Sequence, residues 1–158
     1  MRLLDIILVA WTRCLPQPYG CGEYSSVKDH STDCNRFVNE VCEGMGYKTF
    51  KGLLANQIYD SLMKNGEWLE VAGDVAQFHA NSEALVIAAW KNPTGGHGHV
   101  CVVRPGEAEA SGSWGIMNKT VPKVANVGEP DKCRIDRKAS FSFAKDKIPK
   151  YFVLKSTI

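Results

Sequence analysis

The chain has 158 residues, enough for one domain with its own hydrophobic core and too few for two independent domains. Hydrophobic residues make up 44% of it, a share that excludes an intrinsically disordered chain. The 19 Lys and Arg residues nearly balance the 17 Asp and Glu residues, and a net charge of +2 is too small to predict nucleic acid or an anionic membrane as the main partner. We therefore expect a single globular domain over residues 1–158, active as a monomer.

The first eleven residues combine a basic start with an apolar stretch, as a signal peptide does. However, Asp5 interrupts the stretch, and no small-x-small cleavage signal follows it. An amphipathic helix over Leu3–Arg13 is an equally good interpretation, because apolar residues recur there at helical spacing. The residues expected to face inward are Leu3, Leu4, Ile7, Leu8 and Trp11. No run approaches the 18 or so apolar residues that would span a bilayer.

Two further helices are predicted before residue 66. One covers Asp33–Met45, with Asp33 as its N-cap, and the other covers Asn56–Lys64. A loop rich in Pro, Gly, Ser and Tyr over Pro16–His30 separates the first helix from the second. The inward residues expected on these two helices are Cys34, Phe37, Val38, Val41, Cys42 and Met45, then Ile58, Tyr59, Leu62 and Met63.

After Gly73 the pattern changes from helices to strands. A short helix through Val75 and Phe78 comes first, and several short apolar segments then favour strands. These strand segments are Ala84–Trp90, His99–Val103, Trp114–Met117, Thr120–Val127, Ala139–Phe143 and Tyr151–Lys155. Helices followed by strands indicate an α+β fold in which N-terminal helices pack on an antiparallel sheet.

Cys34 is the first candidate for chemistry, because it directly follows the expected helix cap Asp33. Backbone N–H groups at a helix start, together with the helix dipole, favour a thiolate over a thiol. A thiolate beside an imidazole is an activated nucleophile for acyl transfer. A cysteine on an apolar helix face is also a common core residue, so the interpretation depends on a partner histidine.

Of the four histidines, His99 is the best partner for Cys34. It begins the apolar strand His99–Val103 directly after a glycine-rich loop, so the strand holds its ring while the loop leaves room for a substrate. The other three have weaker settings: His97 lies in the loop, His30 in a polar segment, and His79 near the short helix.

A third polar group normally orients such a histidine and selects its tautomer. Asn118, Asn126 and Asp131 are the candidates by their place on or near the following strands. Asn126 is preferred because it falls near the end of a strand that can lie beside the His99 strand. A structural role for Asn126, in a turn before Gly128, is nearly as good an interpretation.

The segment Asp-Cys-Asn-Arg-Phe-Val at residues 33–38 resembles the Asp-Cys-Ser-Gly-Phe-Val motif of NlpC-type cell-wall cysteine peptidases. Gly-His-Val-Cys-Val-Val at residues 98–103 is similar to their Gly-His-Val strand. Ala-Asn-Gln at 55–57, the run 84–88 and Pro-Gly at 105–106 follow in the order of the small single-domain branch that includes type VI secretion amidase effectors. The resemblance covers roughly Ile6 to Val127.

This resemblance implies a papain-like fold and hydrolysis of an amide bond in the stem peptide of peptidoglycan, commonly between D-glutamate and meso-diaminopimelate. It assigns Cys34 as nucleophile, His99 as general base and Asn126, four residues after Pro122, as the third member. The helix start at Asp33 and Cys34 would hold the oxyanion through backbone N–H groups. Asn35 and Arg36 depart from the family's Ser-Gly, so the approach of the substrate backbone there can differ.

No metal or cofactor is expected for this chemistry, and neither nucleic acid nor a membrane is an expected partner. The resemblance implies a bacteriolytic toxin or lysis enzyme that acts in the periplasm or cell wall. Because no clear signal peptide precedes it, we expect delivery by a secretion system or release by lysis. An immunity or inhibitor protein is a possible partner.

The six cysteines would first suggest three disulfides, but a catalytic Cys34 leaves at most two. Cys42 and Cys101 are expected as buried thiols. Cys14 and Cys21 could pair with each other, or either could pair with Cys133. The aromatic residues Tyr19, Tyr24, Trp90 and Trp114 could line a groove or pack at the edge of the core, and Lys145, Asp146, Lys147 and Lys150 are simplest as a solvated turn.

Two other functions compete with the amidase. Another papain-like acyl transfer, by a lipid acyltransferase or a protein deamidase, would use the same cysteine and histidine. A disulfide-stabilised binding module would have no catalysis at all, and its six sulfurs would be paired or inert.

Overall fold

The computed structural model describes residues 2–115, 119–128 and 133–158 apart from 15–32, and it describes no side chain at 13, 14 or 33. Its α-helices are α1 (Leu3–Cys14), α2 (Asp33–Gly44), α3 (Ala55–Lys64), α4 (Gly73–Asn81) and α5 (Ala139–Ser142). Its strands are β1 (Trp68–Val71), β2 (Val86–Trp90), β3 (His99–Val103), β4 (Glu109–Ala110), β5 (Thr120–Val121), β6 (Lys123–Asn126), β7 (Arg134–Lys138) and β8 (Lys150–Leu154). Short 3-10 helices cover Gly112–Trp114 and Lys155–Thr157.

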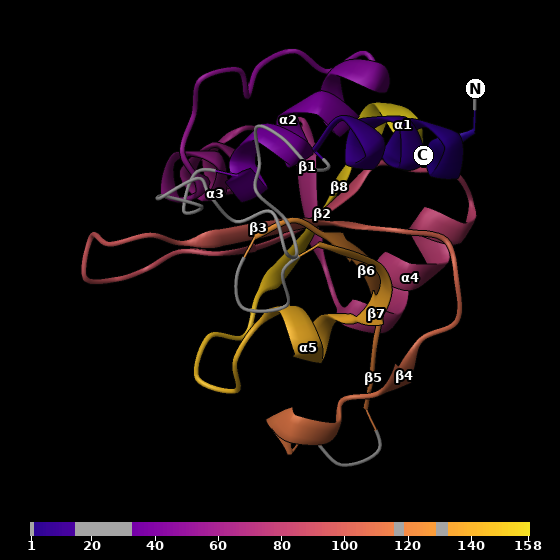
Figure 1. The fold of residues 1–158 in the computed structure, drawn as a ribbon, viewed down its shortest axis with the longest axis vertical. Coiled ribbons are helices and arrows are strands. Elements are labelled where there is room, and N and C mark those ends of the chain that lie inside the picture. The colour runs from indigo at the N-terminus through magenta and orange to yellow at the C-terminus, as the bar shows by residue number, and fades with distance from the viewer. Residues whose placement is uncertain (1, 15–32, 116–118, 129–132) are drawn as a thin grey trace.

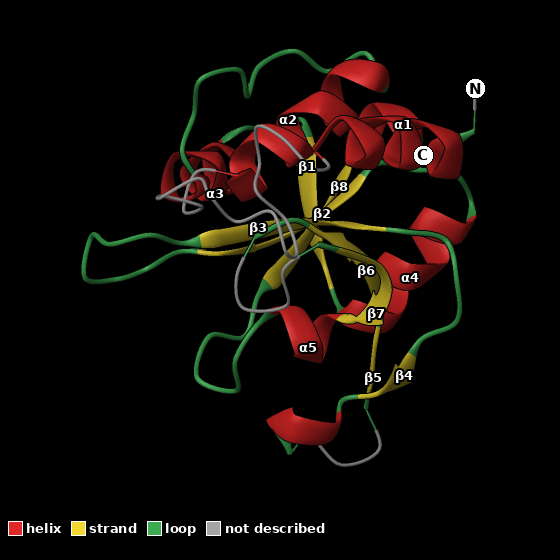
Figure 2. Ribbon diagram, viewed as in Figure 1, coloured by secondary structure: helices red, strands yellow, loops and turns green. Residues whose placement is uncertain are grey.

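The main sheet has six strands in the order β1-β8-β2-β3-β6-β7, and each neighbouring pair is antiparallel (Figure 2). β4 and β5 form a separate two-stranded ribbon. The expected α+β class with an antiparallel sheet is therefore confirmed. β3, which carries His99, lies inside the sheet between β2 and β6, so both of its edges are hydrogen-bonded.

Helices cover both faces of this sheet: α1, α2 and α3 lie on one side and α4 and α5 on the other (Figure 1). Two neighbouring residues of β8 demonstrate the division, because successive strand side chains point to opposite faces. The ring of Phe152 contacts Tyr59 of α3 at 6.1 Å between centroids. The ring of Tyr151 lies against Gly73 of α4.

α1 and α2 pack closely against each other. A Cβ atom added to Gly44 would lie 2.6 Å from Cγ2 of Ile6, so glycine is needed at this contact. α1 buries Leu3, Ile6, Ile7 and Ala10, whereas Leu8, which was expected inside, is exposed. The prediction for Leu8 was wrong because the contact with α2 involves a face rotated toward Ile6 and Ala10. No helix in the described ranges has the length and apolarity to cross a membrane.

α2 agrees most closely with the prediction: Phe37, Val38, Val41 and Cys42 are fully buried. In α3 and α4 the spacing indicated a helix but not always its inner face. Met63, expected inside, is exposed, as are Val75 and Phe78 on α4. Small residues such as Ala76 and Ala80 face the sheet instead, because they allow α4 to approach the strands closely.

Three strand predictions were wrong in part. The segment expected as a strand over Ala139–Phe143 is helix α5 with Phe143 as its C-cap, and the strand β7 precedes it (Figure 2). Pro122 divides the expected strand Thr120–Val127 into β5 and β6, which belong to different sheets, because proline lacks the N–H that a continuous ladder needs. Of the strand expected near Trp114, the described part is a 3-10 helix.

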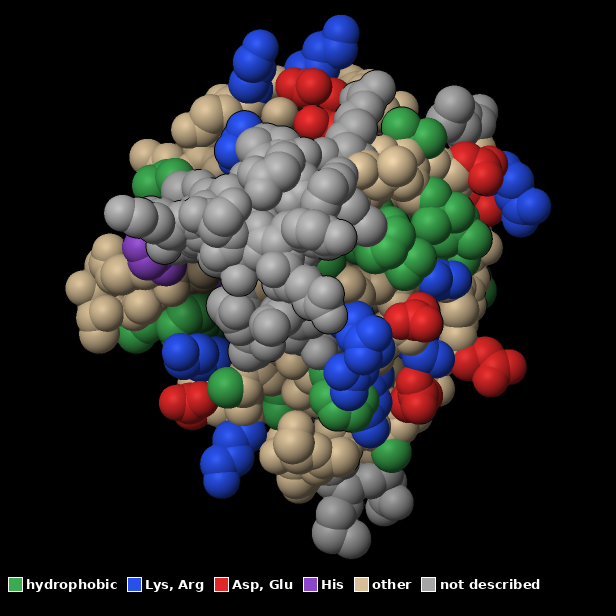
Figure 3. All heavy atoms as spheres, viewed as in Figure 1, with side chains coloured by type: hydrophobic (Ala, Val, Ile, Leu, Met, Phe, Trp, Pro, Cys, Tyr) green, Lys and Arg blue, Asp and Glu red, His purple; other side chains and the backbone are tan. Residues whose placement is uncertain are grey.

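Charges of both signs are mixed on the described surface. On β7, Arg134, Asp136 and Arg137 follow one another closely, and Figure 3 shows Lys and Arg side chains beside Asp and Glu side chains in its lower half. This mixture agrees with the small net charge of the sequence.

Candidate active site

The β2–β3 hairpin that carries His99 is fixed to helix α3 by Asn56. The Asn56 Nδ2 donates to the carbonyl of Gly96 at 2.9 Å, and the Asn56 Oδ1 accepts from the backbone N–H of Asn92 at 2.9 Å. A Cβ atom at Gly98 would collide with Asn56 Oδ1 and lie 2.6 Å from the carbonyl oxygen of Trp90. Glycine at position 98 therefore permits this close packing, which fixes the backbone directly before His99.

His99 and Asn126 form the centre of the site. In the register of β3 and β6, Val102 pairs with Ala125, so Asn126 comes opposite Cys101 and on the same face as Cys101 and His99. His99 Nε2 lies 2.6 Å from Asn126 Oδ1, and both side chains are buried. The sequence-based preference for Asn126 beside His99 is therefore confirmed as geometry, while its catalytic role stays a prediction.

The hydrogen bonds of Asn126 select the tautomer of His99. Asn126 Nδ2 donates to the carbonyl of Gly128 at 3.0 Å, which leaves Oδ1 directed at the imidazole. An amide oxygen only accepts hydrogen bonds, so His99 Nε2 must carry the proton. In the neutral ring, Nδ1 then has the lone pair and is the atom that can act as a base.

Cys101 is a third polar group at this centre, and it was expected only as a buried core thiol. Its Sγ donates to Asn126 Oδ1 at 2.9 Å and lies 3.4 Å from His99 Nε2. The spacing of two residues between His99 and Cys101 is the signal that could have predicted this, because such residues share one face of a strand. Asn126 Oδ1 thus accepts two hydrogen bonds from β3.

Burial controls the charge of His99. It lowers the pKa of His99 from 6.5 to about 4, although the hydrogen bond to Asn126 acts in the opposite direction. The ring of Phe143 also packs against it, with 4.9 Å between ring centroids and 60° between the ring planes. At neutral pH His99 is therefore an uncharged imidazole with a basic nitrogen, which is the state a general base needs.

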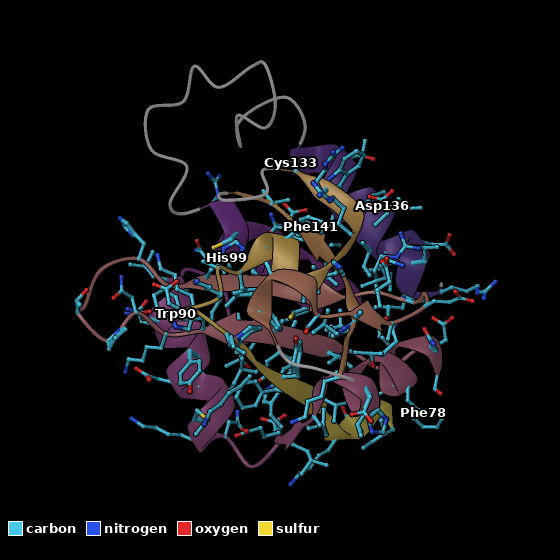
Figure 4. All side chains as sticks on the ribbon, turned by 90° about the horizontal axis from the view of Figure 1, so that it is seen from below. Phe78, Trp90, His99, Cys133, Asp136 and Phe141 are labelled. Atoms are coloured by element: carbon cyan, nitrogen blue, oxygen red, sulfur yellow. The ribbon has the colours of Figure 1, made fainter. Side chains whose placement is uncertain are left out.

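Cys34 is the second residue of α2 and is buried, with 3% of its surface exposed. It is a thiol rather than half of a disulfide. α2 packs against β3, and Figure 4 shows His99 close to the purple ribbon of this helix. The first N–H groups of a helix have no acceptor within the helix, so the position of Cys34 supplies donors and a positive dipole end.

Asn35 stands where the NlpC-type motif has serine, and its side chain forms a contact within the fold. Its side chain is buried, and its Nδ2 donates to the carbonyl of Leu53 at 2.7 Å. This bond ties the segment after α2 back to the start of the helix, whereas Arg36 beside it is exposed. A serine there would be too short to reach the same carbonyl.

The remaining candidates are not brought to this centre. His97 is exposed in the hairpin loop, and His79 lies in the last turn of α4 against Phe78. His30, Asn118 and Asp131 lie outside the described residues, as does the side chain of Asp33. Asp33 is the first residue of α2, so the expectation that it precedes the helix as its N-cap was wrong by one position.

The sulfurs divide into two groups. Cys34, Cys42 and Cys101 are buried thiols, which confirms the expectation for Cys42 and Cys101. Cys133 is disulfide-bonded, and the other cysteines considered for that bond, Cys14 and Cys21, have no described side chain. Six paired cysteines are therefore excluded. Within the described ranges, no three His, Cys, Asp or Glu side chains gather as a set of metal ligands.

Comparison of the sequence with protein-family models and with curated proteins finds no match.

Proposed function

We propose that the protein is a cysteine amidase of papain-like fold that hydrolyses an amide bond in the stem peptide of peptidoglycan. The observation that carries this proposal is the 2.6 Å hydrogen bond between His99 Nε2 and Asn126 Oδ1, which leaves His99 Nδ1 as the basic nitrogen. The start of α2, with Cys34, supplies the nucleophile in this proposal. The motif resemblance over residues 33–38 and 98–103 supplies the substrate class.

The chemistry begins with a neutral pair, because burial keeps His99 uncharged at neutral pH. His99 Nδ1 takes the proton of the Cys34 thiol as the sulfur attacks the amide carbonyl carbon. The imidazolium that forms is stabilised by Asn126 Oδ1. It then gives its proton to the leaving amine as the C–N bond breaks, and a thioester remains on Cys34.

Water completes the cycle. His99 removes a proton from the water molecule that attacks the thioester, and the carboxylic acid product leaves as the Cys34 thiol re-forms. During both steps the carbonyl oxygen becomes an oxyanion. Backbone N–H groups at the start of α2, including that of Cys34, would donate to it.

The proposed bond is the one between D-glutamate and meso-diaminopimelate. The proposed place of action is therefore the periplasm or cell wall, and an immunity or inhibitor protein is the proposed partner. Digestion of purified sacculi tests the assignment, with fragments identified by mass spectrometry. The wild type should leave L-Ala-D-Glu on the glycan strands and release peptides that begin with diaminopimelate, and Cys34→Ala should release none.

Cys42→Ala is the matched control, because it removes a second buried thiol from the same helix. It should keep the activity if Cys34 is the nucleophile. Equal digestion by wild type and Cys34→Ala would overturn the nucleophile. A wild type that digests no sacculi but transfers fatty acyl groups, or releases ammonia from protein glutamine, would identify one of the rival acyl transfers.

A further inference from the structure

Trp90 is the cross-strand partner of His99 in the sheet. β2 and β3 are antiparallel with Trp90 directly opposite His99. Side chains in such a pair share one face, with about 5 Å between their Cβ atoms. Figure 4 shows the two residues on the same side of the molecule. The indole packs against the core yet is only half-buried, so part of its ring stays accessible beside the histidine.

The segment between α5 and β8 covers this part of the sheet. At its start, Phe143 contacts the His99 ring, with 4.9 Å between centroids. Near its end, Lys147 places its Nζ 5.3 Å from the centroid of the Trp90 ring. The pairing of Lys150 with Ala89 then returns the chain to the sheet. One segment therefore contacts both the proposed base and the indole next to it.

Lys147 differs from the two other lysines at this end of the sheet. Lys91 Nζ is bonded to Asp60 at 2.7 Å, and Lys150 Nζ lies 3.6 Å from Glu70. Lys147 forms no ion pair with a carboxylate in the part of the chain that the structure describes. Its ammonium is held on one side by the face of an indole and is open to solvent on the other. The charges next to it are Lys145 and Asp146, which are also exposed.

We infer that Lys147, positioned over Trp90, binds a carboxylate on a residue that flanks the scissile amide. This assignment rests on the proposed function. A D-glutamate linked through its γ-carboxyl group keeps its α-carboxylate beside the scissile bond, and diaminopimelate carries a second carboxylate on the other side. The Lys147 ammonium lies over Trp90, and Trp90 is the cross-strand neighbour of the proposed base His99. A carboxylate on either the D-glutamate or the diaminopimelate is therefore within its reach. The turn that the sequence predicts as merely solvated is then a specificity determinant.

Binding to the full-length Cys34→Ala protein tests this assignment without turnover. The probe is the peptide L-Ala-γ-D-Glu-meso-diaminopimelate, with its Kd measured by calorimetry. Adding Lys147→Gln should weaken binding about tenfold, because one charge-assisted contact is lost. Lys145→Gln is the matched control, since it removes a lysine from the same turn, and its Kd should stay within about twofold.

Two amidated peptides identify the carboxylate. Amidation of the D-glutamate α-carboxylate, or of the diaminopimelate side-chain carboxylate, should weaken binding by the same factor as Lys147→Gln. In the Lys147→Gln protein, that amidation should have no further effect. Equal Kd values with and without Lys147 would overturn the assignment while sacculus digestion by the wild type still supports the amidase. A wild type that neither digests sacculi nor binds the peptide would overturn the proposed function, and this assignment with it.

Discussion

Strand β3 has two buried faces that the protein uses differently. Val100 and Val102 on one face are fully buried in the hydrophobic core. His99 and Cys101 on the other face are also buried, but each forms a hydrogen bond with Asn126 of the neighbouring strand. Equal burial thus has two outcomes. Apolar side chains gain stability from it, whereas polar side chains must find partners, and the partners found here orient a base.

This difference predicts what mutations on each face should do. A smaller residue on the apolar face leaves a cavity, which lowers stability and leaves the chemistry alone. Truncation of a side chain on the polar face leaves a buried donor or acceptor without its partner, which lowers stability and also changes the orientation of His99. The faces can therefore be compared by measuring stability and activity on the same variants.

Asn126→Ala should have the largest effect on catalysis among these comparisons. It removes the acceptor of the His99 Nε2–H, so both tautomers of the ring become available and the base is less well oriented. We expect kcat/KM for a soluble stem peptide to fall on the order of 100-fold. The free energy of unfolding should also fall, by about 1–3 kcal/mol.

Val102→Ala is the control on the opposite face of the same strand. It should lower the free energy of unfolding by about 2 kcal/mol and change kcat/KM less than about twofold. Both quantities come from urea unfolding and steady-state kinetics on the two variants. An Asn126→Ala protein that is destabilised yet fully active would show that the polar face is structural only.

The stability of the fold should depend on pH through His99. Its pKa is about 4 in the folded protein and 6.5 when unperturbed, so the unfolded chain binds more protons between these values. Stability from this residue is therefore complete above pH 6.5 and falls as the pH drops to 4, by roughly 3 kcal/mol. Urea unfolding at pH 7, 5.5 and 4 measures the loss.

His99→Gln separates this contribution from that of the carboxylates. The variant keeps a polar side chain at the start of β3 but cannot titrate. It should lose less stability than the wild type between pH 6.5 and 4. If the free energy of unfolding falls equally with pH in the two proteins, burial does not keep His99 neutral.

Cys101→Ala should have the smallest effect. It removes one of the two hydrogen bonds to Asn126 Oδ1 and leaves the bond from His99 in place. We expect kcat/KM to fall a few-fold and stability to fall by about 1 kcal/mol. Cys101→Ser, which keeps a donor, should recover most of the activity. If the serine variant is as impaired as the alanine variant, Cys101 acts through packing alone.

Local sequence patterns were sufficient to predict several elements. Apolar residues at helical spacing predicted α2 and most of its buried face, since a helix brings such residues to one side. A run of β-branched residues after His99 predicted β3 with the correct bounds. The preference for Asn126 also followed from local order, because consecutive segments of an antiparallel sheet tend to be neighbours.

Other features depended on contacts that no local pattern contains. Leu8 and Met63 fit their helical stripes and are nevertheless exposed, because the neighbouring elements cover a different part of each helix. Ala139–Ser142 has strand-like spacing but is a helix packed on β6 and β7. The strand β7 before it was not predicted, since its charged sequence has no apolar alternation and pairing with β6 stabilises it.

Residue types and their order thus determined the fold class, the main helix, the histidine strand and three candidate groups for chemistry. Only the tertiary structure decided that Asn126 accepts from both His99 and Cys101, and that Lys147 lies over the indole opposite His99. The physical reason is the separation along the chain of the residues that each effect involves. Periodicity reflects the burial of neighbours along one element, whereas tautomers, pKa shifts and shared acceptors arise where distant segments exclude water together.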